Sequence, residues 1–221
     1  MGLTDNLLPG GQVLIASLMF LVGLWFAFRQ ADWERLRADQ GLQHSFFGAA
    51  VVLGFLWQLR AGISPGLSVH FFGITAITLM LGWGLAVFAG LLALVMAVIT
   101  GQEPWRLFAV NGLITVIIPA LASHAIMLWE RGRNFRNFFA YIFFCGFFGA
   151  GIAVGAAGCA MVVMLWFGGA YSWYELVHEY LRYLPLILLP EGFINGAIVT
   201  GLMVFNPERL LTLDPQRYDQ R

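Results

Sequence analysis

Long apolar stretches recur along the whole chain, and only short polar segments separate them. A transmembrane helix needs about 20 apolar residues to cross a hydrocarbon core of about 30 Å. Stretches of this kind lie at 11–28, 44–60, 69–99, 105–129, 138–168 and 183–205. Only 11% of the 221 residues are charged, against about 25% in soluble domains. The sequence therefore predicts an all-α fold, a polytopic membrane helical bundle that occupies 1–221 as a single transmembrane domain.

The stretch 69–99 is too long for one ordinary span. As a single helix it would measure about 46 Å and would need a tilt beyond the usual limit of about 40°. Gly82-Trp83-Gly84 lies in its middle and offers a place for a break. We therefore expect two short spans, 69–81 and 84–99, which brings the total to about seven. The stretch 138–168 is equally long and could break as well.

The arginines give an orientation, because basic loops stay on the cytoplasmic side of a membrane. With seven spans and the N-terminus outside, most arginines fall inside, and six spans would largely remove this bias. The arginines predicted inside are Arg29, Arg35, Arg37, Arg131, Arg133, Arg136, Arg209, Arg217 and Arg221, and those outside are Arg60, Arg106 and Arg182. The sequence thus predicts an N-terminus outside, in a multi-pass protein of the inner (plasma) membrane.

The chain contains no lysine, since all 12 of its Lys and Arg residues are arginine. This excludes a Walker A lysine, a lysine Schiff base and a Ser-Lys dyad. HExxH does not occur and no catalytic constellation is apparent, so we do not expect an enzyme. If the chain takes part in transport driven by ATP, another chain must hydrolyse the nucleotide.

Several polar side chains are predicted in the outer half of the membrane: His70, Asn111, Glu191 and Asn195. Polar groups at such depth are costly and usually face a cavity or a partner. His70 is either a ligand or an interfacial histidine bonded to a loop carbonyl. Glu191 is either a ligand or a hydrogen-bonding or ion-pairing group. Asn111 and Asn195 fit hydrogen bonding between helices better than ligation.

Two other groups of side chains could attract a metal ion. Cys159, Met161 and Met164 are soft donors that suit copper(I), although methionines in membrane helices usually fill space. Glu175, His178 and Glu179 share a helical face in "YSWYELVHEYLRY", where a solvated surface is the simpler interpretation.

Two stretches resemble a known family. "GISPGLSVHFFGITAITLMLGWGLAVFAGLLAL" is similar to the region of CbiM-type and NikM-type proteins in which an outer loop leads to a histidine, and "LPLILLPEGFINGAIVTGLMVF" resembles the Glu-Gly motif of their last span. The resemblance implies the substrate-specific membrane component of an energy-coupling-factor (ABC-type) uptake transporter for cobalt or nickel. Its partners would be a transmembrane scaffold protein and cytoplasmic ATPases. The metal would be cargo, with no cofactor bound permanently and no nucleic acid involved.

In that family the ligands are the N-terminal amine, the amide and imidazole of a histidine at position 2, and a histidine after the outer loop. The last ligand corresponds to His70, whereas position 2 is Gly2 in the run Met1-Gly2-Leu3-Thr4-Asp5. An amine and amide at Gly2, the His70 ring and a fourth donor such as Asp5 or water could still form a square-planar set. Glu191, Asn111 and Asn195 would shape the cavity.

The leading hypothesis is a substrate-capture permease subunit for uptake of a divalent transition metal, cobalt or nickel. One alternative is a non-transporting membrane scaffold or assembly protein, in which the polar groups only hold helices together. The other is a copper-handling membrane protein that uses Cys159, Met161 and Met164.

Overall fold

The computed structural model describes residues 2–3, 8–64, 67–133, 135 and 137–214. Four helical stretches in it are long and apolar enough to cross a membrane: Gly10–Gln30, Trp105–Arg133, Phe138–Phe167 and Trp173–Phe205. They match the predicted spans 11–28, 105–129, 138–168 and 183–205. The stretch 138–168 does not break, because one continuous helical path covers Phe138–Phe167. The predicted all-helical membrane bundle is confirmed at this level.

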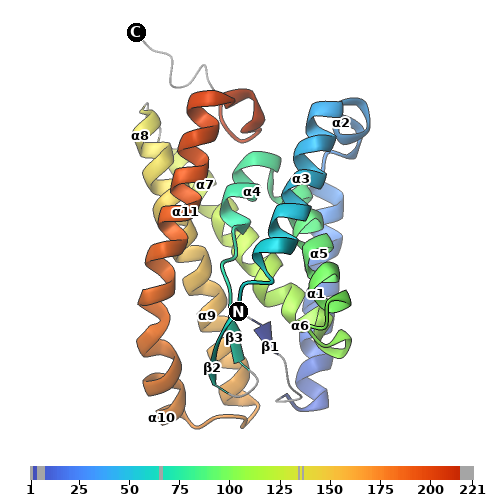
Figure 1. The fold of residues 1–221 in the computed structure, drawn as a ribbon, viewed down its shortest axis with the longest axis vertical. Coiled ribbons are helices and arrows are strands. Elements are labelled where there is room, and N and C mark those ends of the chain that lie inside the picture. Colours follow the sequence, from blue (N-terminus) through green and yellow to red (C-terminus); the bar gives the residue numbers. More distant parts are fainter. Residues whose placement is uncertain (1, 4–7, 65–66, 134, 136, 215–221) are drawn as a thin grey trace.

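The helices lie side by side with their axes roughly along the longest dimension of the molecule (Figure 1). The long ones are α1 (Gly10–Gln30), α3 (Gln40–Leu56), α5 (Trp83–Ile99), α7 (Ile118–Arg133), α9 (Gly149–Phe167) and α11 (Leu184–Phe205). The short α-helices are α2 (Trp33–Ala38), α4 (Ile74–Leu81), α6 (Phe108–Gly112), α8 (Phe138–Ala140) and α10 (Trp173–Glu175). Short π- and 3₁₀-helical turns are η1 (Trp105–Leu107), η2 (Leu113–Ile117), η3 (Tyr141–Phe148), η4 (Leu176–Tyr180), η5 (Leu181–Tyr183) and η6 (Pro207–Arg209).

The two ends of the bundle differ in composition. One end carries α2 and α8, and we call it the arginine-rich end because α2, the last turn of α7 and η6 all contribute arginines. The opposite end carries α10 and the strands β2 (Ala61–Ser64) and β3 (Leu67–Val69), and we call it the sheet end (Figure 1).

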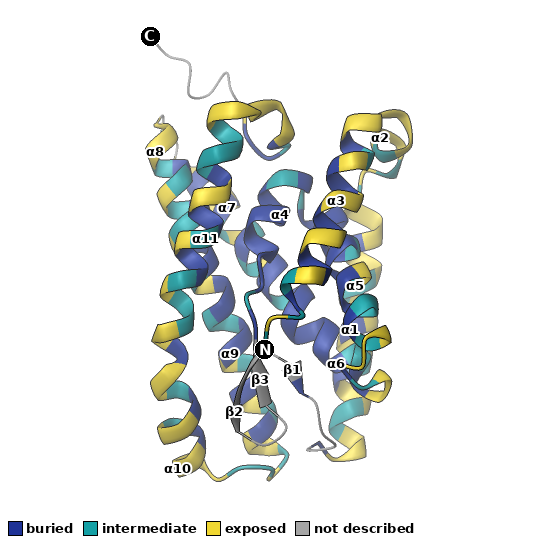
Figure 2. Cartoon of the chain, viewed as in Figure 1, coloured by how far each residue is buried: buried dark blue, intermediate teal, exposed yellow. Residues whose placement is uncertain are grey.

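The outer faces of the helices are apolar. Leu14, Leu18 and Leu21 of α1 are each more than half exposed. Apolar patches of that extent are rare on soluble monomers and mark contact with a membrane or a partner. Figure 2 shows the same pattern, with exposed residues along the outer helices and an almost wholly buried α4 between them.

The predicted span 44–60 is shifted, because α3 covers Gln40–Leu56. Asp39 explains the earlier start, since its side chain accepts a hydrogen bond from the Leu42 N–H and caps the helix. The predicted span 84–99 corresponds closely to α5.

The predicted span 69–81 was wrong at its beginning. Residues 69–73 are extended or irregular, and α4 starts only at Ile74, which leaves it 8 residues long. Gly73 precedes it with φ 66°, a left-handed conformation that favours glycine. A helix of this length cannot cross a bilayer by itself.

The predicted break at Gly82-Trp83-Gly84 is confirmed. Gly82 separates α4 from α5 with φ 78° and ψ 155°, values that glycine adopts readily. A Cβ on Gly84 would lie 2.7 Å from the backbone nitrogen of Ala31, so glycine also permits the close approach of α5 to the end of α1.

A small antiparallel sheet, which the sequence did not predict, joins the N-terminus to the loop before α4. Its order is β1-β3-β2, where β1 is Gly2–Leu3. Gly2 pairs with Ser68, and Leu3 pairs with Leu67. β1 thereby lies between the helices, beside β3 and towards the sheet end (Figure 1).

Candidate functional site

The N-terminal strand is fixed by a side chain of the facing helix. Leu3, which is fully buried, donates its backbone N–H to Asn111 Oδ1 at 3.0 Å. Asn111 Nδ2 donates in turn to the Leu3 carbonyl at 3.1 Å. Asn111 thus pairs with β1 as a neighbouring strand would. Two elements therefore hold β1 in place, β3 on one side and the α6 helix that carries Asn111 on the other. This paired contact is a more specific role than the interhelical bonding expected from the sequence.

His70 lies between β3 and α4 and is buried, with 5% of its surface exposed. Its ring centroid is 5.0 Å from that of Trp57 and 5.4 Å from that of Phe72. Its Nδ1 is 3.1 Å from the Phe71 carbonyl oxygen. Because a carbonyl can only accept, Nδ1 carries the proton in this contact, and Nε2 carries the lone pair of the neutral ring.

A cavity of about 430 Å³ opens beside His70. The end of α3 and the residues after it supply Gln58 and Arg60 to its wall, and α11 supplies Pro190. The imidazole therefore faces a space large enough for a small ligand or a hydrated ion.

Glu191 and Asn195 of α11 cap the beginning of α4. The Glu191 carboxylate accepts hydrogen bonds from the Phe72 N–H at 2.9 Å and from the Gly73 N–H at 2.7 Å. Asn195 Oδ1 accepts from the Ala76 N–H at 2.8 Å, and Asn195 Nδ2 donates to Glu191 Oε1 at 2.9 Å. A helix N-terminus exposes N–H groups without partners and favours a negative charge, so these two buried side chains satisfy the first N–H groups of α4.

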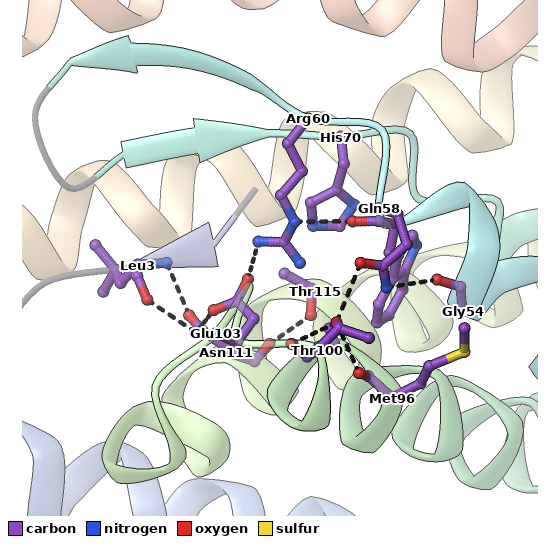
Figure 3. A network of polar contacts seen from close by, with 12 residues as sticks. Leu3, Gly54, Gln58, Arg60, His70, Met96, Thr100, Glu103, Asn111 and Thr115 are labelled. Atoms are coloured by element: carbon purple, nitrogen blue, oxygen red, sulfur yellow. Dashed lines mark hydrogen bonds and ion pairs between the residues drawn. The ribbon is translucent and has the colours of Figure 1, made fainter.

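A buried ion pair completes the surroundings of His70. Arg60 Nη1 pairs with Glu103 Oε1, and the two side chains are 8% and 1% exposed. Arg60 Nε donates to the Trp57 carbonyl at 2.8 Å. The second Glu103 oxygen accepts from Asn111 Nδ2. Figure 3 shows that Arg60 lies beside His70. It also shows that Glu103 lies between Arg60 and the Asn111–Leu3 contact and bonds to both.

Glu103 lies in the connection between α5 and η1, outside the helices. Burial raises the pKa of the Glu103 carboxyl above its ordinary value, while the Arg60 guanidinium and the Asn111 amide oppose that rise. The ion pair is therefore the main reason that a carboxylate can persist at this buried position.

The structure brings together most of the residues singled out from the sequence. Gly2, His70 and Asn111 lie around the sheet, and Glu191 and Asn195 lie on the α4 side of the same loop. Asp5 lies outside the described residues. Within the described part of the chain, no three His, Cys, Asp or Glu side chains form a group that could hold a metal ion.

The two other groups that were considered as metal-attracting each include an exposed side chain, unlike the buried His70. On α9, Cys159 is exposed whereas Met161 is fully buried, so these two of the three soft donors considered for copper(I) do not face a common space. His178 is exposed, as expected for a surface residue, and its ring stacks on Tyr174 with centroids 4.0 Å apart.

Sequence reasoning missed Arg60 and Glu103. Arg60 was counted only as an arginine predicted outside, Glu103 was not singled out, and 43 positions separate them in the chain. The available signal was that Glu103 is an isolated acid between two apolar stretches, in the run "TGQEPW".

The family model for the cobalt uptake substrate-specific transmembrane region (CbiM) matches residues 3–209. The chain belongs to the CbiM family. It is therefore a multi-pass membrane component of a family for cobalt uptake, and that family is one of transport proteins rather than enzymes. No curated protein sequence matches it significantly.

Two solved structures share the CbiM-family fold of this chain. One is described as a truncated transition metal transporter, with a TM-score of 0.78, 15% sequence identity, and coverage of 92% of this chain and 99% of the other. The second is described as a transition metal transporter, with the same TM-score and identity and coverage of 96% of both chains. At this identity the likeness bears on the fold alone.

Proposed function

We propose that this CbiM-family chain captures a divalent transition-metal ion, cobalt(II) or nickel(II), at the sheet end of the bundle. The observation that carries the proposal is the position of β1. Asn111 and β3 hold Gly2–Leu3 inside the bundle, and the register places Gly2 opposite Ser68, two positions before His70. This register supports a site in which backbone nitrogen near Gly2 and the His70 imidazole would act together.

The donor set would be the His70 ring, the amide and amine at the N-terminal segment around Gly2, and Asp5 or water. The contact of His70 Nδ1 with the Phe71 carbonyl supports this assignment. Metal-binding histidines commonly donate their other ring nitrogen to a carbonyl, which fixes the tautomer and the ring orientation. Glu191 would then support the site by holding the backbone of Phe72 and Gly73, and Asn195 would support it by donating to the Glu191 carboxylate.

The topology supports uptake from outside the cell. We infer about seven passes through the membrane, counting α4 with its preceding loop as one, with the N-terminus outside and the whole chain forming one transmembrane unit. The arginine-rich end would then face the cytoplasm, in agreement with the positive-inside rule. A chain without lysine cannot carry a Walker A motif, so partner ATPases and a transmembrane scaffold would supply the energy.

The experiment is calorimetric titration of the purified chain in detergent with cobalt(II), nickel(II) and copper. We expect micromolar or tighter binding of cobalt or nickel, and its loss in His70→Ala. His178→Ala is the matched control, because it removes an exposed histidine outside the site and should bind as the wild type does. A folded wild-type chain that binds none of these ions would contradict the proposal and favour a non-transporting scaffold.

A further inference from the structure

A positive charge lies beside the space where the proposed function puts a dication. Arg60 and His70 line the same cavity, and Figure 3 shows their side chains next to each other. A guanidinium stays protonated at any physiological pH. In a buried site of low effective dielectric, it would repel a divalent cation much more strongly than it would in water.

Glu103 offsets that charge without being one of the residues that line the cavity. It is the ion-pair partner of Arg60 and is almost fully buried, at 1% side-chain exposure. Glu191 is the other buried carboxylate near His70, but its two oxygens are engaged by the amides that begin α4. The charge that directly balances Arg60 is therefore that of Glu103.

The Glu103 carboxylate also contacts Asn111, the side chain that binds the backbone of β1. Its second oxygen accepts from Asn111 Nδ2, the group that donates to the Leu3 carbonyl. Glu103 thus contacts two groups near the proposed site: the Arg60 guanidinium, which lines the cavity, and the Asn111 amide, which binds β1. A ligand role is poorly compatible with this position, because both oxygens already accept hydrogen bonds from protein donors.

We propose that Glu103 is a positioning residue for metal capture: its carboxylate neutralises Arg60, so that the cavity beside His70 accepts a divalent cation. This inference rests on the proposed function and adds a residue that acts through Arg60. A purely structural ion pair would support the fold equally well in the presence or absence of metal. The two roles differ in what happens when Arg60 is removed.

The test is calorimetric titration of the purified full-length chain in detergent with cobalt(II) and nickel(II) chloride. Glu103→Gln keeps the shape and removes the charge, and we expect it to weaken binding by about tenfold or more. Arg60→Met removes the repelling charge and should bind at least as tightly as the wild type. The double variant should recover to within about threefold of the wild type.

Two further variants serve as controls. Glu103→Asp keeps the charge and should bind nearly as the wild type does. If Glu103→Gln fails to fold, Glu103→Asp and Arg60→Met together test whether Glu103 acts by neutralising Arg60. Glu175→Gln removes an exposed carboxylate of the same size at the sheet end and should leave affinity unchanged. Thermal unfolding of each variant without metal reports stability separately from binding.

Three results would overturn the inference. If Arg60→Met and the double variant bind as weakly as Glu103→Gln, the pair has a structural role only. If Glu103→Gln binds as the wild type does while His70→Ala does not bind, the metal site exists without charge compensation by Glu103. If the wild type binds neither cobalt nor nickel, the proposed function fails together with this inference.

Discussion

Two buried polar clusters flank the loop that carries His70, and they hold the backbone in different ways. Glu191 and Asn195 satisfy the first N–H groups of α4, which are the N–H groups of a helix that begins inside the bundle. Asn111 pairs with both backbone groups of Leu3 in a two-residue strand. The first cluster stabilises an element of the core, whereas the second fastens the end of the chain.

Because the two clusters hold different parts of the backbone, substitutions in them should affect stability and metal affinity to different extents. Loss of the α4 cap would leave buried donors without partners, and such groups cost about 1–3 kcal/mol each. Loss of the Asn111 contact would release a short segment that can find water at the sheet end. We therefore expect substitutions in the first cluster to lower both stability and metal affinity, and substitutions in the second to act mainly on affinity.

The largest effect is expected for Glu191→Ala. It leaves the N–H groups of Phe72 and Gly73 without their acceptor and removes the side-chain acceptor of Asn195 Nδ2. We expect this to lower the free energy of unfolding by about 3–5 kcal/mol. Thermal unfolding in detergent measures the loss. Leu189→Ala on the exposed face of α11 is the control and should change stability little. A Glu191→Ala protein as stable as this control would show that water replaces the cap.

Asn111→Ala should have a smaller effect on stability and a clear effect on binding. Two hydrogen bonds to Leu3 and one to Glu103 disappear, so we expect a loss of about 1–2 kcal/mol in stability and about tenfold in metal affinity. Titration with cobalt(II) or nickel(II) and thermal unfolding measure the two effects. Asn137→Ala removes an amide that caps α8 at the arginine-rich end, and its metal affinity should stay at the wild-type value. If both variants bind metal with equal affinity, β1 does not contribute to the metal site.

The smallest effect is expected for Thr212→Val, at the other end of α4. Thr212 Oγ1 donates to the Leu79 carbonyl at 2.6 Å and lies 2.7 Å from the Tyr141 hydroxyl, so the segment after α11 caps the end of α4. We expect a loss of about 1 kcal/mol in stability and no change in metal affinity. A clear fall in affinity would instead mean that the arginine-rich end influences the site through α4.

The sequence predicted the architecture because membrane burial imposes a simple pattern. Spans such as 11–28 and 183–205 must be long and apolar, and a break must contain residues such as Gly82 that tolerate unusual backbone angles. It also singled out His70, Asn111, Glu191 and Asn195, because polar groups at membrane depth are costly enough to need a reason. It failed at the start of α4, where hydropathy does not distinguish an extended loop buried in protein from a helix.

What the sequence by itself determined, then, is a helical membrane bundle and a short set of buried polar residues. Only the tertiary structure decided how those residues are paired. The two-residue strand β1 has no periodicity to reveal it, and it exists because β3 and Asn111 supply its hydrogen-bond partners. The Arg60–Glu103 pair likewise joins two loops far apart in the chain, and the burial that makes each charge significant comes from the packing of the helices around them.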